Sequence, residues 1–374
     1  MEVSAEEDLE LVVVEALVHV VPHQVVLLLL PRLVLLQVCG DLVIAQQPGV
    51  DCVRAHVHVV FLFHHRCLAA VLQRVHPLPF WVLLQTIPAQ ELLPFLPDLL
   101  VGKGVMSVGM SEPDAGSSVT ELKTSATPDG DDFLVNGSKV FGTNSGDAEV
   151  FLIYLRFGPG TEGIGSALIE KGTSGFEIGP GYRYMNGESW SPLYFDNCRI
   201  PKANILLGSG GFKKQISGFN IERLGNAARA VAVGRKAFNE ARDHAKTRRQ
   251  FGRDICEFQG LQWKFAEMQM RLEAAQLLLM RAVTRADNGL PSAQDSALAK
   301  LACNDAGFFA ANEALQIMGA LGFSDDNIVQ YCMRRTRGWM IAGGSTEILK
   351  NRIAEGIFER RFSQRPSKPA KDGA

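Results

Sequence analysis

Lysine is missing from the first 102 residues of this 374-residue chain, and glycine is almost missing from them. The first lysine is Lys103, and only Gly40 and Gly49 precede Gly102. Seven of the eight histidines lie in the same stretch, whereas His244 is the only one after it. Amphipathic helices need polar residues on their wet face, and this stretch contains apolar runs without such a face. Its composition therefore excludes an ordinary globular domain before about residue 95.

Two explanations fit residues 1–94. In the first, residues 1 to about 92 are translated in a wrong frame or from the wrong strand, because common Glu and Lys codons read as Leu codons on the opposite strand. The second is a degenerate, unusually apolar helical domain. A membrane helix is not expected, because residues such as Glu15, Pro22 and Arg32 interrupt every apolar window long enough to span a bilayer.

Other absences exclude whole classes of protein. The seven cysteines include no Cys-x-x-Cys pair, which argues against zinc sites, thioredoxin motifs and disulfide frameworks. A net charge of -2 offers no basic surface to nucleic acid or anionic lipid. The acidic start at Glu6, Glu7 and Asp8 differs from a secretory signal or a transit peptide. These features predict a cytoplasmic protein, or one of the mitochondrial matrix if the source is eukaryotic.

No metal site is expected from the histidines. The pairs His56/His58 and His64/His65 are close in sequence, but neither has the i, i+4 spacing that puts two ligands on one helix face. The compositional bias of the segment already explains how frequent histidine is there.

From Val101 onwards, short β-prone runs alternate with turn residues. Asn136-Gly137 after Phe133–Val135 predicts a hairpin turn, and Phe151–Leu155 predicts a strand before the turn at Gly158–Gly160. After Gly211 the pattern becomes helical, with breaks at 287–291 and 319–322. The prediction is an α+β chain: an anomalous segment 1–94, a β domain 95–211, a helical bundle 212–365 and a tail 366–374.

Six short motifs occur in this part of the chain. They are Met110–Ser117, Asn136–Asn144, Phe195–Pro201, Arg248–Gly252, Gln316–Phe323 and Gly343–Ile348. Through these motifs, in this order, residues 95–365 resemble the acyl-CoA dehydrogenase family of flavoproteins. The resemblance implies a central β-barrel domain followed by a C-terminal four-helix bundle. The usual N-terminal helical domain of the family is not recognisable in residues 1–94.

The resemblance implies FAD as cofactor. Ser111 is expected at the pyrimidine edge of the flavin and Ser117 at the CoA moiety, in a turn where Gly116 allows close approach. Thr143 is expected at flavin N5, and Phe141 replaces the tryptophan that usually stacks on the ring. An ordinary polar turn and a core role for Phe141 are the alternatives. The implied cofactor residues are Met110, Ser111, Ser117, Phe141, Thr143, Arg248, Phe251, Gln259, Gln316, Gly319, Ala320, Ser345, Thr346 and Glu347.

Arg248 carries a further implication. Its guanidinium suits bidentate contact with a pyrophosphate, and in the family this arginine reaches the flavin of a neighbouring subunit. Gln316 and Gly319 resemble the segment that packs beside the same dinucleotide. The implied assembly is a homodimer or homotetramer bridged by FAD, although the basic residues around Arg248 could also be a solvated helix face.

The catalytic base departs from the commoner pattern of the family, in which a glutamate occupies the position of Gly343. A minority of members, the isovaleryl and long-chain types among them, carry the base in a Glu-Arg-Leu motif on an earlier helix, and this chain reads Glu222-Arg223-Leu224. Glu222 is therefore the expected base and Glu347 the reserve. An apolar pocket should raise the pKa of such a base towards neutrality. Alternatively, Glu222 and Arg223 form a surface ion pair. The implied substrate residues are Ser117, Phe219, Asn220, Arg223 and Gly343.

The implied activity is α,β-dehydrogenation of an acyl-CoA, with electrons passed to an electron-transferring flavoprotein. A flavin oxidase or monooxygenase on the same fold is one alternative, distinguished by fast reaction of the reduced flavin with oxygen. An inactive remnant without the N-terminal domain is the other. Neither a nucleic-acid partner nor a membrane partner is expected. The length and branching of the acyl group depend on pocket residues that the motifs do not identify.

Overall fold

The computed structural model describes residues 104–286 and 290–363, together with the backbone of three strands between residues 29 and 45. The chain divides into two compact units. In the first unit, β1 (Leu29–Leu30), β2 (Leu33–Val38) and β3 (Asp41–Ala45) form an antiparallel sheet. These residues form strands rather than helices. The rest of the anomalous segment, with its histidine pairs and the proposed frame boundary, lies outside the described residues.

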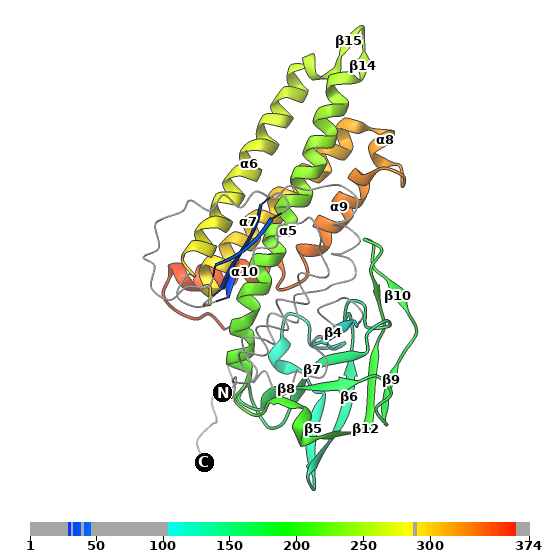
Figure 1. Cartoon of the computed structure of the whole chain (residues 1–374), viewed down its shortest axis with the longest axis vertical. Helices are drawn as coiled ribbons and strands as arrows, with labels where there is room; N and C mark the ends of the chain where they lie inside the picture. Colours follow the sequence, from blue (N-terminus) through cyan, green and yellow to red (C-terminus); the bar gives the residue numbers. More distant parts are fainter. Residues whose placement is uncertain (1–28, 31–32, 39–40, 46–103, 287–289, 364–374) are drawn as a thin grey trace, which may run out of the picture. The chain divides into compact units, whose positions relative to one another are not determined.

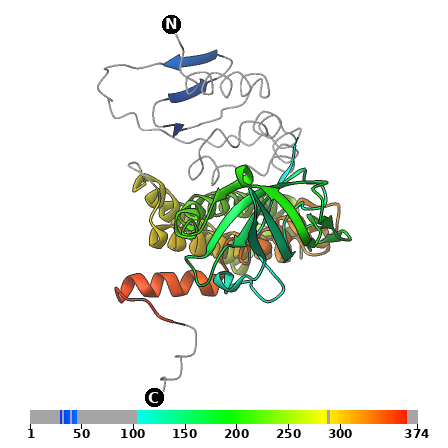
Figure 2. The ribbon, with the colours of Figure 1, turned by 90° about the horizontal axis from the view of Figure 1, so that it is seen from below.

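The second unit contains an eight-stranded sheet, shown in Figure 1 and, from the sheet end, in Figure 2. Its strands are β4 (Met106–Gly109), β5 (Ser125–Asp129), β6 (Asp132–Lys139), β7 (Val150–Arg156), β8 (Ile164–Glu170), β9 (Phe176–Ile178), β12 (Leu193–Pro201) and β13 (Ile205–Leu207). Their order is β13-β8-β7-β5-β6-β12-β9, with β4 pairing β7. No pairing among the described strands joins β13 to β9, so the sheet is open where a closed barrel was predicted.

Two strand predictions had different outcomes. The run Phe151–Leu155 lies in β7, whose hairpin partner is β8, and the turn at Gly158–Gly160 separates them as predicted. The hairpin at Asn136-Gly137 was wrong, because both residues lie within β6. The turn occurs instead at Gly130-Asp131, between paired Asp129 and Asp132, with Gly130 at a φ of 65°. Gly137 serves a close approach: a Cβ there would lie 2.7 Å from the Cα of Thr124.

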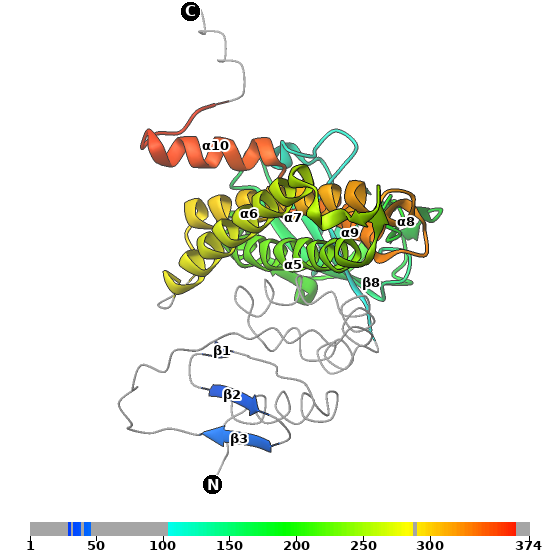
Figure 3. The same cartoon turned by 90° about the horizontal axis from the view of Figure 1, so that it is seen from above.

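A smaller hairpin and the helices complete the unit. The hairpin pairs β10 (Tyr182–Arg183) with β11 (Ser189–Trp190). The helices are α5 (Phe212–Thr247), α6 (Gln259–Thr284), α7 (Ala293–Met318), α8 (Ala320–Phe323), α9 (Ile328–Trp339) and α10 (Thr346–Ile357). Figure 3 shows α5, α6 and α7 side by side, with α10 along α7. The predicted α+β order, a β domain followed by a helical bundle, is confirmed.

Small residues bring α5 and α7 unusually close. A Cβ on Gly307 of α7 would lie 2.4 Å from the carbonyl oxygen of Ala230 on α5, and a Cβ on Gly234 would lie 2.7 Å from the Cα of Gly307. Real Cβ atoms do not approach a backbone so closely, so glycine is required at this crossing. Helix α5 runs through this crossing without a break over 36 residues, which places the residues at its two ends far apart.

Candidate active site

Glu222 lies in α5, about three turns from its start, with a side chain that is only 16% exposed. Its Oε1 atom lies 3.8 Å from Nη2 of Arg229, two helical turns further on. Arg223, the partner considered from the sequence, instead directs its hydrogen bonds to Gly343 and Asn220. The carboxylate is therefore part-buried and paired within the helix.

Arg223 connects α5 to the loop before α10. Its Nε donates to the carbonyl oxygen of Gly343 at 3.2 Å, and its Nη1 donates to Oδ1 of Asn220 at 2.9 Å. The amide of Asn220 in turn donates to the carbonyl oxygen of Pro291. Gly343 has a φ of 71°, a backbone conformation that favours glycine. The structure thus connects Asn220, Arg223 and Gly343, three residues implied for the substrate, and places Arg223 next to Glu222 in the chain.

Lys300 supports the same loop from α7, although the motifs gave no sign of it. Its Nζ is buried and donates to the carbonyl oxygens of Trp339 and Gly344, each at 3.0 Å. Burial and the neighbouring Arg223 lower the pKa of Lys300 to about 8, against the attraction of Glu222. A lysine in the apolar pattern of a bundle helix was the signal that could have revealed it.

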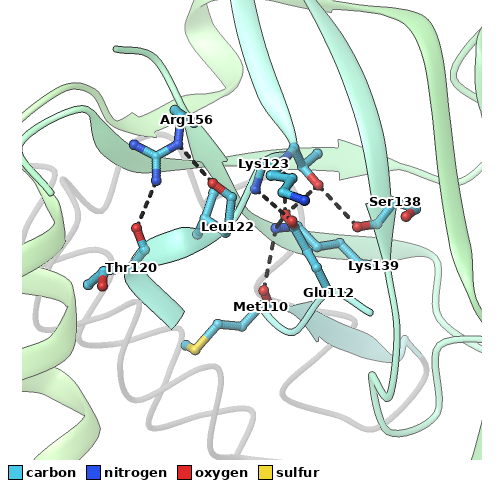
Figure 4. A network of polar contacts seen from close by, with 9 residues as sticks. Met110, Glu112, Thr120, Leu122, Lys123, Ser138, Lys139 and Arg156 are labelled. Carbon is cyan, nitrogen blue, oxygen red and sulfur yellow. Dashed lines mark hydrogen bonds and ion pairs between the residues drawn. The ribbon is translucent and has the colours of Figure 1, made fainter. Parts of the chain in front are cut away.

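The turn that carries Met110, Ser111 and Ser117 is held by a buried ion pair (Figure 4). Nζ of Lys139 lies 2.7 Å from Oε1 of Glu112, and both side chains are almost fully buried. The same carboxylate accepts hydrogen bonds from the main-chain N–H groups of Lys123 and Thr124 and from the Thr124 hydroxyl. Ser117 is exposed, and Gly116 has no atom near a built Cβ. The turn therefore has a rigid base and an open outer side.

Phe141 and Thr143 lie in a strained loop directly after β6. Phe141 has a φ of 61° and a side chain that is 57% exposed, and a non-glycine residue in this region costs on the order of 1–3 kcal/mol. The Tyr184 hydroxyl donates to the carbonyl oxygen of Phe141, and the Ser107 hydroxyl donates to that of Thr143. The Phe141 ring packs against Trp190 at 4.6 Å between centroids. Phe141 is thus not a core residue but an exposed aromatic face held in place.

A second set of predicted cofactor residues lies at the other end of the bundle. All of its members are exposed: Arg248, Phe251, Gln259, Gln316, Gly319 and Ala320. Phe251, 93% exposed and with a φ of 52°, forms the tip of a hairpin of β14 (Arg249–Gln250) and β15 (Arg253–Asp254). Figure 1 shows this hairpin at the end of α5 opposite the sheet. Within one chain, these six residues therefore lie away from Ser111 and Phe141.

The remaining predicted residues form the start of α10. Ser345 caps the helix, its hydroxyl accepting from the main-chain N–H of Ile348. The N–H of Thr346 donates to the carbonyl oxygen of Met340. Glu347 is fully exposed, and main-chain and Ser345 hydrogen bonds lower its pKa below the usual value. A water-exposed carboxylate with a lowered pKa is poorly suited to act as a general base near pH 7.

The described part of the chain offers neither a membrane-spanning helix nor a cluster of metal ligands. None of its helices is both long and apolar enough to cross a membrane. It also contains no group of three or more His, Cys, Asp or Glu side chains arranged to hold a metal ion.

Comparison with known proteins agrees with this geometry. The family model of the acyl-CoA dehydrogenase middle domain matches residues 107–198, and that of the C-terminal domain matches residues 209–358. A short-chain-specific acyl-CoA dehydrogenase of Clostridium acetobutylicum is 35% identical over 269 residues, 71% of each chain. The chain belongs to the acyl-CoA dehydrogenase family. It is therefore an FAD-dependent oxidoreductase by family, as the six motifs predicted.

Two solved structures resemble this acyl-CoA dehydrogenase closely. Butyryl-CoA dehydrogenase of Megasphaera elsdenii has a TM-score of 0.68 and 30% identity, covering 73% of this chain and 75% of that one. A chain from a structure of the electron transferring flavoprotein of Acidaminococcus fermentans has a TM-score of 0.67, 30% identity and the same coverage. In both cases the likeness extends over about three quarters of the chain.

Residues of this chain fit FAD beside the turn at Ser111 and the loop after β6. The exposed Phe141 ring on a strained backbone offers a face for the isoalloxazine, and the open turn at Ser111 lies beside it, because the main-chain N–H of Val140 donates to the carbonyl oxygen of Ser111. Strain of this kind is concentrated at ligand sites. The supporting residues Glu112, Lys139 and Trp190 were missed from sequence. Lys139 could have been noticed, because strand alternation places it inward with Val135.

Proposed function

We propose that this acyl-CoA dehydrogenase removes a proton from the α-carbon of an acyl-CoA thioester through Glu222 as the C–H bonds at the α- and β-carbons are broken. Bound FAD supplies the two-electron oxidant that accepts hydride from the β-carbon, so an α,β-unsaturated thioester leaves. The observation that carries the proposal is the part-buried Glu222 on α5, next to an arginine that holds the Gly343 loop.

The other residues have positioning roles in this proposal. The main-chain N–H at Gly343 donates to the thioester carbonyl oxygen and favours the enolate-like charge that develops there. Arg223 fixes the Gly343 peptide by holding its carbonyl oxygen, while Asn220 and Phe219 line the approach of the CoA arm. Ser111, Phe141 and Thr143 orient the flavin, and Ser117 contacts CoA. The exposed Glu347 takes no proton from substrate.

We infer a homodimer or homotetramer in which two chains share each flavin. Arg248 follows Glu222 by 26 residues, which is about 39 Å along a helix at 1.5 Å per residue. That distance is too long for one extended FAD to contact both ends of the same α5. Arg248, Phe251, Gln259, Gln316, Gly319 and Ala320 would instead contact the flavin of a neighbouring copy. An electron-transferring flavoprotein in the cytoplasm or mitochondrial matrix would then take the electrons.

Spectroscopy of the purified protein tests the proposal. The flavin absorbance should be present and should bleach anaerobically with at least one thioester from a panel of straight, branched and ω-carboxylated acyl-CoA compounds. Electron-transferring flavoprotein should restore the absorbance much faster than oxygen does, whereas the reverse order would indicate an oxidase. A protein that binds FAD but is bleached by no member of the panel would rule the dehydrogenase out.

A further inference from the structure

Polar groups continue along α5 beyond the proposed base. Asn226 and Arg229 follow Glu222 by four and seven residues, spacings that put all three on one face of the helix. Asn226 is 1% exposed, and its Oδ1 has no hydrogen-bond partner. Hydrocarbon placed along this face would leave the buried Oδ1 atom of Asn226 without a hydrogen bond, which is unfavourable.

If the proposed function holds, the acyl chain extends from Glu222 along α5 towards Arg229. The inference rests on that function. The residues assigned to the CoA arm, Phe219 and Asn220, lie on the N-terminal side of Glu222 along α5. The thioester carbonyl faces Gly343, whose loop Arg223 holds. With the thioester on that side of the base, the far end of the acyl group extends towards Arg229.

Positive charge gathers around the same place. Arg335 of α9 forms an ion pair with Glu188, and Lys300 donates to two main-chain carbonyls. Arg229 donates to the carbonyl oxygen of Gly225 in its own helix and lies 5.5 Å from the centre of the Trp339 ring. Burial and nearby Arg335 lower the pKa of Arg229, against the attraction of Glu222 and Glu188. These contacts leave the guanidinium 3.8 Å from the carboxylate that has to act as a base.

This arrangement works against proton abstraction from a plain hydrocarbon acyl group. A guanidinium beside a carboxylate stabilises its negative charge and so opposes the uptake of a proton. An anionic group on the substrate would compete for the same guanidinium through charge-assisted hydrogen bonds. Its binding would offset the cation and free Glu222 to take the α-proton.

We propose that Arg229 is a specificity-determining residue that binds a carboxylate at the far end of the acyl chain, so that the substrates are CoA monothioesters of short α,ω-dicarboxylic acids. The chain has to be short. A base works within about 3 Å of the proton it removes, and Nη2 of Arg229 is 3.8 Å from Glu222 Oε1. The carboxylate therefore lies within a few carbon atoms of the α-carbon.

Matched thioesters test the specificity. Rapid flavin reduction is measured with succinyl-, glutaryl- and adipyl-CoA, and with propionyl-, butyryl- and valeryl-CoA, which lack only the terminal carboxylate. At least one carboxylated member should exceed its neutral match in kcat/KM by about 30-fold or more, the size expected for a buried charge pair.

Variants then assign the effect to Arg229. Arg229→Gln should lower kcat/KM for the carboxylated thioester by about 30-fold or more. It should speed flavin reduction by the neutral match, because the cation that opposes proton uptake by Glu222 is gone. Arg229→Lys should recover part of the lost kcat/KM, because lysine keeps the positive charge but lacks the bidentate geometry of the guanidinium. Arg242→Gln, on the exposed side of the same helix beside Asp243, is the control and should change neither.

Three outcomes are distinguishable. Preference for the neutral thioesters in the wild type overturns the inference while the dehydrogenase function stands. An equal loss with both thioesters in Arg229→Gln means that Arg229 is structural, and also overturns it. Bound flavin that no thioester reduces overturns the proposed function itself.

Discussion

Burial separates the two glutamates that the sequence left as candidate bases. The Glu222 side chain is 16% exposed and lies 3.8 Å from Arg229, whereas Glu347 is fully exposed at the start of α10 with a lowered pKa. An acid–base group at a carbon acid needs a site from which water can be excluded. The surroundings of the two glutamates therefore favour Glu222 over Glu347, which is the order that the resemblance implied.

Glu222→Gln preserves the size of the side chain and removes the basic carboxylate. We expect flavin to stay bound but its reduction by substrate to slow by at least about 10²–10⁴-fold, the usual contribution of a general base. Glu347→Gln is the matched control and should stay within about tenfold of wild type, as measured by stopped-flow absorbance. The opposite pattern would show that Glu222 is structural.

The Glu112–Lys139 pair allows a second prediction about single residues. Lys139→Met leaves a buried carboxylate without its cation and should lower the free energy of unfolding by about 3–5 kcal/mol. Lys139→Met combined with Glu112→Gln should be less destabilised than the Lys139 variant alone, since no buried charge remains and the amide oxygen can still accept one of the two main-chain hydrogen bonds. Denaturant titrations of all four proteins measure the coupling. Strict additivity would mean that the pair contributes nothing.

The pH dependence of the same pair has a definite sign. Burial alone would raise the pKa of Glu112, but attraction to Lys139 and the hydrogen bonds from Lys139, Thr124 and Lys123 lower it below the usual 4.5. A carboxyl group whose pKa is lower in the folded state than in the unfolded state stabilises the protein at pH values above its unfolded-state pKa. This stabilisation is lost as the pH falls through the folded-state pKa. Below about pH 4.5 the wild type should therefore lose stability more steeply than Glu112→Gln.

At the scale of elements, the α5–α7 crossing depends on glycine rather than on helix propensity. Gly307→Ala should destabilise the protein by about 1–3 kcal/mol despite the better propensity of alanine, because the new methyl would meet the Ala230 backbone. Gly260 in α6 is the control, since a built Cβ there meets no atom within 4 Å. Gly260→Ala should be neutral or stabilising by up to about 1 kcal/mol in thermal unfolding. A neutral Gly307→Ala would show that the crossing can relax.

Elements were easier to predict from sequence than their pairing. The strand at Phe151–Leu155 and the helices after Gly211 follow from apolar periodicity, which is local. The hairpin at Asn136-Gly137 failed because a glycine can serve either a turn or a close approach, and only the position of Thr124 decides between them. Closure of a barrel likewise depends on whether the edge strands β9 and β13 pair with each other. No local sequence pattern predicts that pairing.

At the scale of the whole molecule, some residues of the candidate site belong to sequence motifs, and others join it only through the packing of helices. The motifs predicted roles for Ser111, Thr143 and Glu222, because a resemblance assigns a role to each position that matches the motif. Arg229 and Lys300 lie outside every motif and became visible only when helices far apart in sequence were brought together. A charged residue in an apolar helical pattern was the one sign of them in the sequence, and it does not tell which group it will meet.

The assembly gives a prediction at this scale. Arg248→Lys keeps the charge but loses the fork that suits a pyrophosphate. If a neighbouring copy's flavin binds there, FAD retention and oligomer stability should fall together, as measured by flavin content and by light scattering across a dilution series. Arg242→Lys, exposed on the same helix, should change neither. Unchanged FAD affinity and oligomer size in Arg248→Lys would contradict the shared site.

The uninterrupted length of α5 has a genetic consequence. In a two-fold dimer, each chain would provide Glu222 to its own flavin and Arg248 to that of its neighbour. A chain defective at residue 222 and a chain defective at residue 248 would each be inactive when expressed alone. Co-expressed, they would form mixed dimers in which one flavin has both intact residues and the other has neither. Such dimers should regain up to half of the wild-type activity, so two loss-of-function alleles would complement each other.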